Sequence, residues 1–333
     1  MNAFEFANAP TVEAAVKLLT PSDPKTDPDE LPRALAGGQD LLTTIKAYIT
    51  PAPRVVNLKT IQGLDKIADD GRGGLKIGAL ATITAIEESE TIRKNFPGLA
   101  QAAHSIATPQ IRNIGTIGGN LCQRPRCWYF RLETVKCLKK GGTECYASIG
   151  QNKYNAIIAG GPSYIVHPSD LAPMLIALNA TLTITGPEGS RTIPVQEFFA
   201  LPKVSVRHEN VLKPGEIVTE VQVPATALAA KSTYLKFKER ESLDFAMSAV
   251  AAALEMAADG TVKDARLVLA GVAPIPWRVP DAEKALIGKK PDAATLLNVA
   301  QIALQDADPL EHNAYKVPLT QTLMRRAIAS LTA

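Results

Sequence analysis

The chain has 333 residues, 46% of them hydrophobic and 21% charged, so it is long and apolar enough to bury a sizeable core and is not a disordered protein. Lys and Arg number 36 and Asp and Glu 33, a formal charge of +3 that gives no reason to expect nucleic-acid binding. No apolar run is long enough to cross a bilayer, and the N-terminus lacks the basic and apolar regions of a secretory signal, so we expect no membrane insertion.

The first 224 residues alternate short strands with helices. Thr11 followed by an amphipathic run predicts a capped helix that begins at Val12. By the same reading, strands are expected at 34–36, 54–58, 75–80, 181–184 and 217–223, and helices at 83–90, 97–107 and 171–178.

A second unit follows a short connection. Pro224 ends the strand expected at 217–223, and residues 225–230 are interpreted as a linker. The remaining hundred residues predict strands at 247–256 and 265–272 and helices at 292–304 and 319–331. We therefore expect two domains, residues 1–224 and residues 230–333.

Three segments carry residues suited to a phosphate-bearing ligand, at 37–40, 115–120 and 169–170. Glycine lets the backbone approach a ligand closely, and N–H groups beside a helix start favour an anion. No G-x-G-x-x-G follows the first strand and no G-x-x-x-x-G-K-[ST] occurs, so neither a Rossmann domain nor a P-loop is predicted. Each glycine pair alone is more often an ordinary turn.

All four cysteines, Cys122, Cys127, Cys137 and Cys145, fall within one window of 24 residues. Four thiolates match the ligand count of a 4Fe–4S cluster or a tetrahedral zinc site, but no C-x-x-C knuckle typical of zinc is present. The same window holds six Lys or Arg against two Glu, and cations lower the pKa of nearby thiols. Two disulfides, which need an oxidising compartment, and four incidental thiols are the other interpretations.

In their order and in their residues, these segments resemble the FAD-binding medium subunits of molybdenum hydroxylases, the xanthine dehydrogenase and carbon monoxide dehydrogenase group. The match runs over nearly the whole chain. The matching segments are A-G-G-Q-D-L at 36–41, I-G-A-L at 77–80, T-I-G-G-N at 116–120, S-D-L at 169–171 and L-K-P-G-E-I at 212–217, followed by Lys236, Arg240 and Asp244.

The resemblance implies an α+β fold. It consists of a two-lobed FAD-binding domain of the vanillyl-alcohol-oxidase (PCMH) type and a C-terminal α+β domain of the CO dehydrogenase flavoprotein type. Gln39 departs from the family, where Thr or Ser is frequent, but an amide still donates to phosphate. The residues that the resemblance assigns to FAD are Ala34, Leu35, Ala36, Gly37, Gly38, Gln39, Asp40, Leu41, Thr116, Gly118, Gly119, Asn120, Ser169, Asp170, Leu212 and Lys236.

The segment C-Q-R-P-R-C at 122–127 resembles an insertion in FAD subunits of the periplasmic aldehyde oxidoreductase subgroup, which carry an extra 4Fe–4S cluster. The resemblance therefore implies an insertion at about 121–160. Within it Cys122, Cys127, Cys137 and Cys145 would bind the cluster.

The function implied is electron transfer in a molybdenum-containing aldehyde oxidoreductase, with no catalytic residue in this chain. A large subunit with the molybdenum cofactor and a small subunit with two 2Fe–2S clusters would complete a hetero-oligomer, and FAD would pass electrons to an external acceptor. The alternatives are a stand-alone FAD-dependent dehydrogenase and a zinc-stapled interaction module. The expected location is the cytoplasm, or the periplasm after export with a signal-bearing partner.

Overall fold

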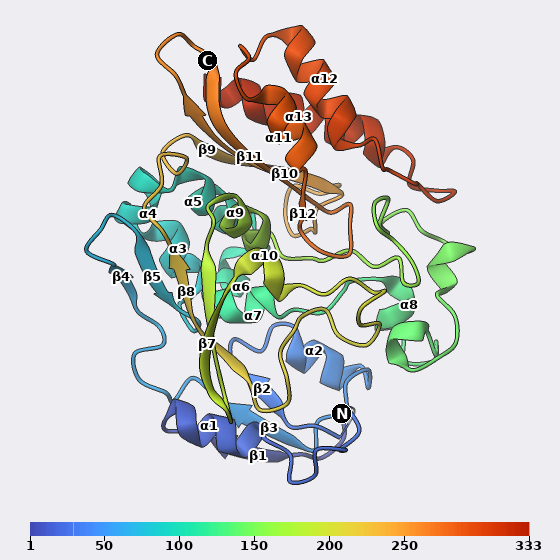
Figure 1. The fold of residues 1–333 in the computed structure, drawn as a ribbon. Helices are drawn as coiled ribbons and strands as arrows, with labels where there is room; N and C mark the ends of the chain where they lie inside the picture. Colours follow the sequence, from blue (N-terminus) through green and yellow to red (C-terminus); the bar gives the residue numbers. More distant parts are fainter. Residues whose placement is uncertain (29, 333) are drawn as a thin grey trace.

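A computed structural model describes residues 1–28 and 30–332, which form three sheets with helices around them (Figure 1). The N-terminal sheet is parallel, in the order β1-β3-β2. Helix α1 begins after Thr11, whose side chain accepts the N–H of Ala14, as the sequence predicts. The elements of this layer are β1 (Glu5–Asn8), α1 (Val12–Leu19), β2 (Arg33–Leu35), α2 (Leu41–Lys46) and β3 (Arg54–Asn57).

The central sheet has five antiparallel strands in the order β4-β5-β8-β6-β7. It joins segments that lie far apart in the chain, since β5 pairs with β8. Its strands are β4 (Ile67–Asp69), β5 (Leu75–Gly78), β6 (Thr181–Gly186), β7 (Gly189–Pro194) and β8 (Ile217–Val223). The helices between these strands are α3 (Ile83–Glu88), α4 (Glu90–Asn95), α5 (Pro97–His104), α6 (Pro109–Arg112), α7 (Ile117–Leu121), α9 (Leu171–Ala177) and α10 (Val195–Phe198).

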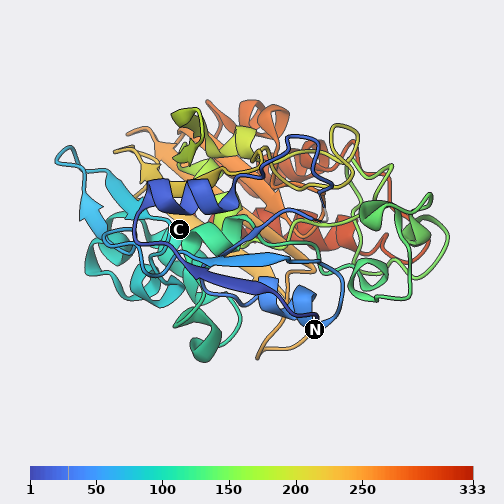
Figure 2. The same ribbon diagram turned by 90° about the horizontal axis from the view of Figure 1, so that it is seen from below.

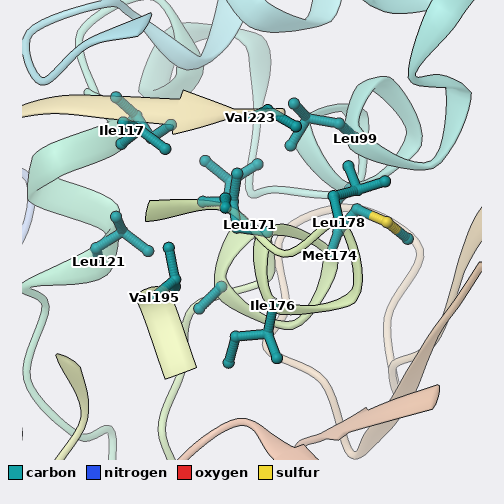
Figure 3. Packing of buried hydrophobic residues seen from close by; sticks show 14 of the residues in the cluster. Leu99, Ile117, Leu121, Leu171, Met174, Ile176, Leu178, Val195 and Val223 are labelled. Carbon is teal, nitrogen blue, oxygen red and sulfur yellow. The ribbon is translucent and has the colours of Figure 1, made fainter. Parts of the chain in front are cut away.

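The main apolar core lies between this sheet and its helices, with α9 at its centre. All seven residues of α9 are buried, and they pack against side chains from α5, α7, α10 and β8 (Figure 3). Burying apolar surface on every side of one helix fixes the positions of the elements around it.

The C-terminal unit is an antiparallel sheet in the order β12-β11-β10-β9, covered by helices on its outer face (Figure 1). Alternate residues of β10 enter different cores: Ala249, Ala251 and Ala253 belong to the main core, whereas Val250 and Leu254 belong to a second core under the helices. The elements are β9 (Ser232–Phe237), β10 (Ser248–Met256), β11 (Val262–Ala270), β12 (Trp277–Arg278), α11 (Pro280–Leu286), α12 (Ala293–Ala303) and α13 (Lys316–Thr332).

The cysteine segment, residues 122–160, has little regular structure. Its elements are α8 (Trp128–Arg131), η1 (Leu138–Lys140) and η2 (Tyr146–Ser148), each three or four residues long. It forms the green lobe at one edge of the molecule in both ribbon views (Figures 1 and 2).

The α+β class expected from the sequence is confirmed, and the strands and helices it predicts are present with small shifts of their ends. The helix expected at 83–90 ends at Glu88, because Ser89 ends α3 and caps a second helix, α4, that the sequence analysis did not predict. The strands that were not predicted are β1, β4, β7, β9 and β12, which are short or carry exposed residues. Among the described residues no helix is long and apolar enough to span a bilayer. Residue 333, the last of the expected C-terminal domain, lies outside the described residues.

Candidate cofactor-binding site

Two glycine loops from different parts of the chain lie against each other. The first connects β2 to α2, and within it Gly38 has a φ of +73°, a conformation that favours glycine. A Cβ on Gly37 would lie 2.2 Å from the carbonyl oxygen of Ile114, so only glycine fits at this crossing. The first loop therefore rests on the backbone that leads into the second.

The second loop, at 116–120, forms the start of α7. Thr116 is the N-cap, and its Oγ1 accepts the N–H of Gly119 at 3.2 Å. Asn120 continues the loop toward the S-D-L segment, because its Oδ1 accepts the hydroxyl of Ser169 at 2.5 Å. All three phosphate-binding candidates of the sequence thus meet in one place.

The two loops line a cavity of about 380 Å³, here called the glycine cavity. Of the residues assigned to FAD, those that line it are Ala34, Ala36, Gly37, Gly38, Gln39, Asp40, Leu41, Thr116, Gly119, Asn120 and Asp170. The wall residues that the sequence analysis did not assign to FAD include Arg33, Ile83, Ile106, Ile111, Arg124, Arg126, Leu243, Asp244 and Phe245. Exposed glycine backbone beside apolar walls suits a ligand with both phosphates and flat rings.

The other residues assigned to FAD, which do not line the glycine cavity, are Leu35, Gly118, Ser169, Leu212 and Lys236. Leu35 belongs to a small apolar cluster, and Leu212 packs against the main core. Gly118 is buried against Ala79, where a Cβ would lie 2.9 Å from the carbonyl oxygen. These residues shape the packing beside the cavity.

Asp170 connects the two halves of the molecule at the edge of the cavity. Its buried carboxylate accepts hydrogen bonds from the hydroxyl of Tyr234 and from Nζ of Lys236, both at 2.8 Å and both from β9. Burial, together with the charge of Asp170, raises the pKa of Tyr234 well above its ordinary value, so this hydroxyl remains a neutral donor. The carboxylate expected to bind the flavin nucleotide is therefore already held by two donors of the chain.

Asp40 anchors the cysteine segment to the first glycine loop. Its Oδ2 accepts the backbone N–H of Arg124 at 2.7 Å, and its Oδ1 lies 2.8 Å from Nη2 of Arg131 and 3.0 Å from Nη1 of Arg126. The resemblance assigns Asp40 to FAD and gives no hint of this second role. Hydrogen bonds to a charged group are the strong ones, so the glycine loop and the cysteine segment form one unit.

A second cavity of about 320 Å³, here called the aromatic cavity, adjoins the first. The residues common to both walls are Arg126, Pro168, Asp170, Asp244 and Phe245. Beyond them the aromatic cavity is lined by Cys127, His167, Ser169 and the edge-to-face pair Trp128 and Tyr154, whose ring centroids are 5.3 Å apart. It therefore connects the glycine cavity with the cysteine segment.

All four cysteines are unpaired thiols, which excludes the disulfide interpretation for this structure. Cys127 and Cys137 share a small apolar cluster with Ile49 and Phe130. Burial raises the pKa of Cys127, and the charge of Cys145 adds to that shift, so these two thiols are near each other. Cys122 lies at the end of α7 and lines the glycine cavity, and burial raises its pKa to about 12.

Hydrogen-bond donors and a cation lie near three of the four thiols, although burial raises the pKa of Cys127. Nδ2 of Asn155 lies 3.7 Å from Sγ of Cys127, and the N–H of Tyr164 donates to Sγ of Cys145 at 3.5 Å. Burial lowers the pKa of Lys140, and the charges of Cys137 and Cys127 oppose that shift, which places this cation beside both thiols. Such donors are of the kind that an iron–sulfur cluster uses, and they surround Cys127, Cys137 and Cys145, whereas Cys122 packs against the main core.

A single-ion site finds no support in the part of the chain that the structure describes. There no three His, Cys, Asp or Glu side chains are close enough to hold one metal ion. In a 4Fe–4S cluster each thiolate binds a different iron, so the thiolates stand farther apart than around one zinc ion. The arrangement thus leaves the zinc interpretation without a site and does not test the cluster.

A buried ion cluster, which the sequence analysis missed, attaches the cysteine segment to the loop after α10. Glu209 is 5% exposed and accepts hydrogen bonds from Nε of Arg124 at 2.9 Å and from Nζ of Lys139 at 2.8 Å. Burial opposes its ionisation, but the two cations lower the pKa of Glu209 below its ordinary value. The basic residues of the segment thus have a structural role beside the thiols.

Comparison with known proteins gives full-length matches. The family described as "FAD binding domain in molybdopterin dehydrogenase" matches residues 2–226, and "CO dehydrogenase flavoprotein C-terminal domain" matches residues 232–331. The "Aldehyde oxidoreductase FAD-binding subunit PaoB" of Escherichia coli is 33% identical over 319 residues, which cover 94% of this chain and 95% of the relative. The "Carbon monoxide dehydrogenase medium chain" of Hydrogenophaga pseudoflava is 28% identical and covers 89% and 88%.

A solved structure agrees with these matches. A chain of carbon monoxide dehydrogenase from Hydrogenophaga pseudoflava superposes with a TM-score of 0.76 and 26% identity, covering 100% of this chain and 99% of that chain. The glycine cavity, which is lined by both glycine loops and by apolar side chains, also suits the nucleotide of the matching FAD-binding domain. The chain therefore belongs to the FAD-binding medium subunits of the xanthine dehydrogenase and carbon monoxide dehydrogenase family, which are subunits of oxidoreductases.

Proposed function

We propose that this chain is the FAD- and iron–sulfur-carrying electron-transfer subunit of a molybdenum-containing aldehyde oxidoreductase. The observation that carries the proposal is the attachment of the cysteine segment to the first glycine loop through Asp40. Because one carboxylate holds donors from Arg124, Arg126 and Arg131, a cofactor at the glycines and a cluster at the cysteines would share a wall. Two redox carriers so close together are suited to exchange electrons.

The glycine loops would hold FAD, which when bound accepts electrons and passes them on. The start of α7 after Thr116 and the backbone at Gly37 and Gly38 would bind the pyrophosphate, because they line the glycine cavity. Ile106 and Ile111 line the same cavity and would exclude water from the rings. The role of the chain is thus to bind, orient and shield the flavin.

The cysteine segment would hold a 4Fe–4S cluster through Cys122, Cys127, Cys137 and Cys145. The four thiols match the ligand count of such a cluster, and basic side chains offset the negative charge of thiolate ligands. The N–H donors to the sulfurs of Cys127 and Cys145 would help set its potential. Because burial raises the pKa of Cys122 to about 12, binding at this thiol releases a proton near neutral pH.

Partner subunits would carry out the oxidation itself. A large subunit with the molybdenum cofactor would oxidise the aldehyde, and a small subunit with two 2Fe–2S clusters would deliver the electrons to this chain, which passes them to an external acceptor. The name of the relative from Hydrogenophaga pseudoflava, a medium chain, supports a hetero-oligomer. The aldehyde class rests on the name of the Escherichia coli relative.

The experiment is cofactor analysis of the chain purified under anaerobic conditions together with its partners. We expect one FAD and about eight irons per complex, about four of them beyond the irons of the two 2Fe–2S clusters, with an additional EPR signal after dithionite reduction. Cys137→Ser removes a ligand and should abolish that signal. Thr134→Ala changes an exposed residue of the same segment and should leave the iron content unchanged.

Other outcomes would favour the alternatives. FAD with only about four irons per complex, those of the small subunit, would overturn the cluster and leave a flavin subunit whose cysteines need another account. Zinc in place of the additional irons would favour a zinc-stapled module. Oxidation of an aldehyde by the isolated chain, with an artificial acceptor and no partner, would favour a stand-alone FAD-dependent dehydrogenase.

A further inference from the structure

Arg126 occupies a position that the resemblance to the family does not account for. It lines both the glycine cavity and the aromatic cavity, and the residue after it is Cys127. Its guanidinium carbon lies 4.7 Å from the centroid of the Phe245 ring, another residue common to both walls. The side chain therefore stands between the cavity for FAD and the cysteine segment.

Arg126 shares its counter-charge. The carboxylate of Asp40 serves two guanidinium groups, those of Arg126 and Arg131, so neither cation has a carboxylate to itself. The two carboxylates common to both cavities have cations of their own. Asp170 pairs with Lys236 at 2.8 Å, and Asp244 pairs with Arg240 at 3.4 Å.

Arg126 also has an unused hydrogen-bond donor. Its Nη1 is paired with Asp40, and its Nη2 donates to Oε1 of Gln123 at 3.2 Å. Its Nε is buried and has no hydrogen-bond partner among the described residues. A buried N–H without an acceptor is costly, so an acceptor atom of a ligand in the adjoining cavity would stabilise this arrangement.

We infer that Arg126 is a charge-setting residue which favours the reduced form of FAD over the oxidised form. The inference rests on the proposed function, which supplies the electrons from the partner subunits. Two-electron reduction follows FAD + 2e⁻ + H⁺ → FADH⁻, with the proton taken from solvent, so the product carries one more negative charge. A fixed cation in a partly buried wall stabilises that product more than the reactant.

The test uses Arg126→Gln and Arg126→Lys in the complex purified with its partners, with the flavin midpoint potential measured by spectroelectrochemical titration. For R126Q we expect the preference for reduced over oxidised FAD to fall about tenfold, which for a two-electron couple lowers the potential by roughly 30 mV. R126K keeps the charge and should change the preference less than threefold. If Arg126 acted through packing alone, the flavin potentials of R126Q and R126K would not differ in this way.

Arg131→Gln is the matched control, because it removes an equal charge from the same carboxylate but lines neither cavity. R131Q should shift the flavin midpoint potential by less than R126Q does. The inference is overturned if R126Q leaves the potential unchanged, if R131Q matches its shift, or if R126Q weakens the binding of oxidised and reduced FAD equally.

If R126Q does not fold, a second variant tests the inference. Asp40→Asn removes the opposing carboxylate, so the potential should rise, and a fall or no change would overturn the inference. The wild-type complex separates the two ideas. Wild-type complex without FAD would contradict the proposed function, whereas an unchanged potential in flavin-loaded R126Q would contradict only the role of Arg126.

Discussion

Around α9 all the residues from Leu171 to Ala177 are buried, and their neighbours are the apolar side chains of the main core (Figure 3). In the cysteine segment the regular elements span three or four residues. Charged groups tie much of it to the rest of the chain, whereas Ile157 and Ile158 near its end enter the second core. Asp40 and Glu209 hold its first half, and Lys316 donates to three backbone carbonyls, two of them at Tyr154 and Asn155.

This difference shows that two adjoining regions of one subunit depend on different forces. Apolar packing fixes the helices that carry the second glycine loop, and dissolved ions do not screen it as they screen charge pairs. Buried charge pairs hold the first half of the cysteine segment, and removing one partner leaves the other charge buried and unpaired. Substitutions in the two regions should therefore differ in how far their effect spreads and in how it responds to salt.

The largest effect is expected in the apolar core. Phe198→Ala removes a fully buried ring of α10 and should lower the free energy of unfolding by about 4 kcal/mol. Urea unfolding monitored by far-UV circular dichroism measures this, at low and at high salt, and the loss should be the same at both. Leu297→Ala, at a side chain 46% exposed, is the control and should change stability by less than about 0.5 kcal/mol.

A smaller and more local effect is expected at the buried ion cluster. Glu209→Gln leaves Lys139 and Arg124 without their carboxylate and should cost about 3 kcal/mol, confined to the cysteine segment. Hydrogen exchange should show faster exchange in residues 122–160 and little change in α9. Glu5→Gln breaks an exposed pair with Arg54 and should cost less than about 1 kcal/mol. Faster exchange throughout the core of E209Q would contradict the separation of the two regions.

The sequence predicts the apolar region well because its signal is local. Periodicity and caps identify α1, α5, α9, α12 and most strands of the two antiparallel sheets, since a buried face leaves a pattern within a few residues. The glycine loops are recognised only from their combination and from the resemblance to the family, because each glycine pair alone is more often an ordinary turn. Their contact through Gly37 is not recognised, because nothing local shows which backbone will cross it.

The charged region is predicted only in part, because its partners are far away in the chain. Arg124, Arg126 and Arg131 stand out in the sequence as basic neighbours of thiols, but their carboxylates, Asp40 and Glu209, lie more than 75 residues away. A charge pair leaves no periodic pattern on either segment. Asp40 stands at the end of a glycine loop, and the resemblance assigns it to FAD alone. Its contact with the cysteine segment therefore has no signal in the sequence.

His167 is a titratable group at the border of the apolar region, so the stability of that region depends on pH to some extent. Burial lowers its pKa to about 4, and its ring meets that of Phe199 edge-on at 4.6 Å. In the unfolded state the pKa of this histidine is about 6.5, so the unfolded chain binds the proton more tightly. The contribution of neutral His167 to the free energy of unfolding is therefore complete above pH 6.5 and is lost as the pH falls toward 4.

Between pH 7 and pH 5.5 the unfolding free energy should fall by about 1 kcal/mol because of His167. Urea unfolding at both pH values of the wild type and of His167→Asn measures it. The variant should lose this part of the pH dependence, since Asn does not titrate. An equal pH dependence in both proteins would place the acid sensitivity elsewhere.

The smallest effect is expected where local structure alone shapes the glycine cavity. Thr116→Val removes the hydroxyl that caps α7 through the N–H of Gly119, at a cost of about 1 kcal/mol. Because that helix start forms the wall of the cavity, FAD should bind roughly fivefold more weakly, which corresponds to the same free energy. Thr11→Val removes the cap of α1, whose residues do not line the cavity, so stability should fall by a similar amount while FAD affinity stays constant. If T116V binds FAD as the wild type does, the cap orders the helix without ordering the phosphate contacts, and the glycine cavity depends on the packing behind it rather than on its own loop.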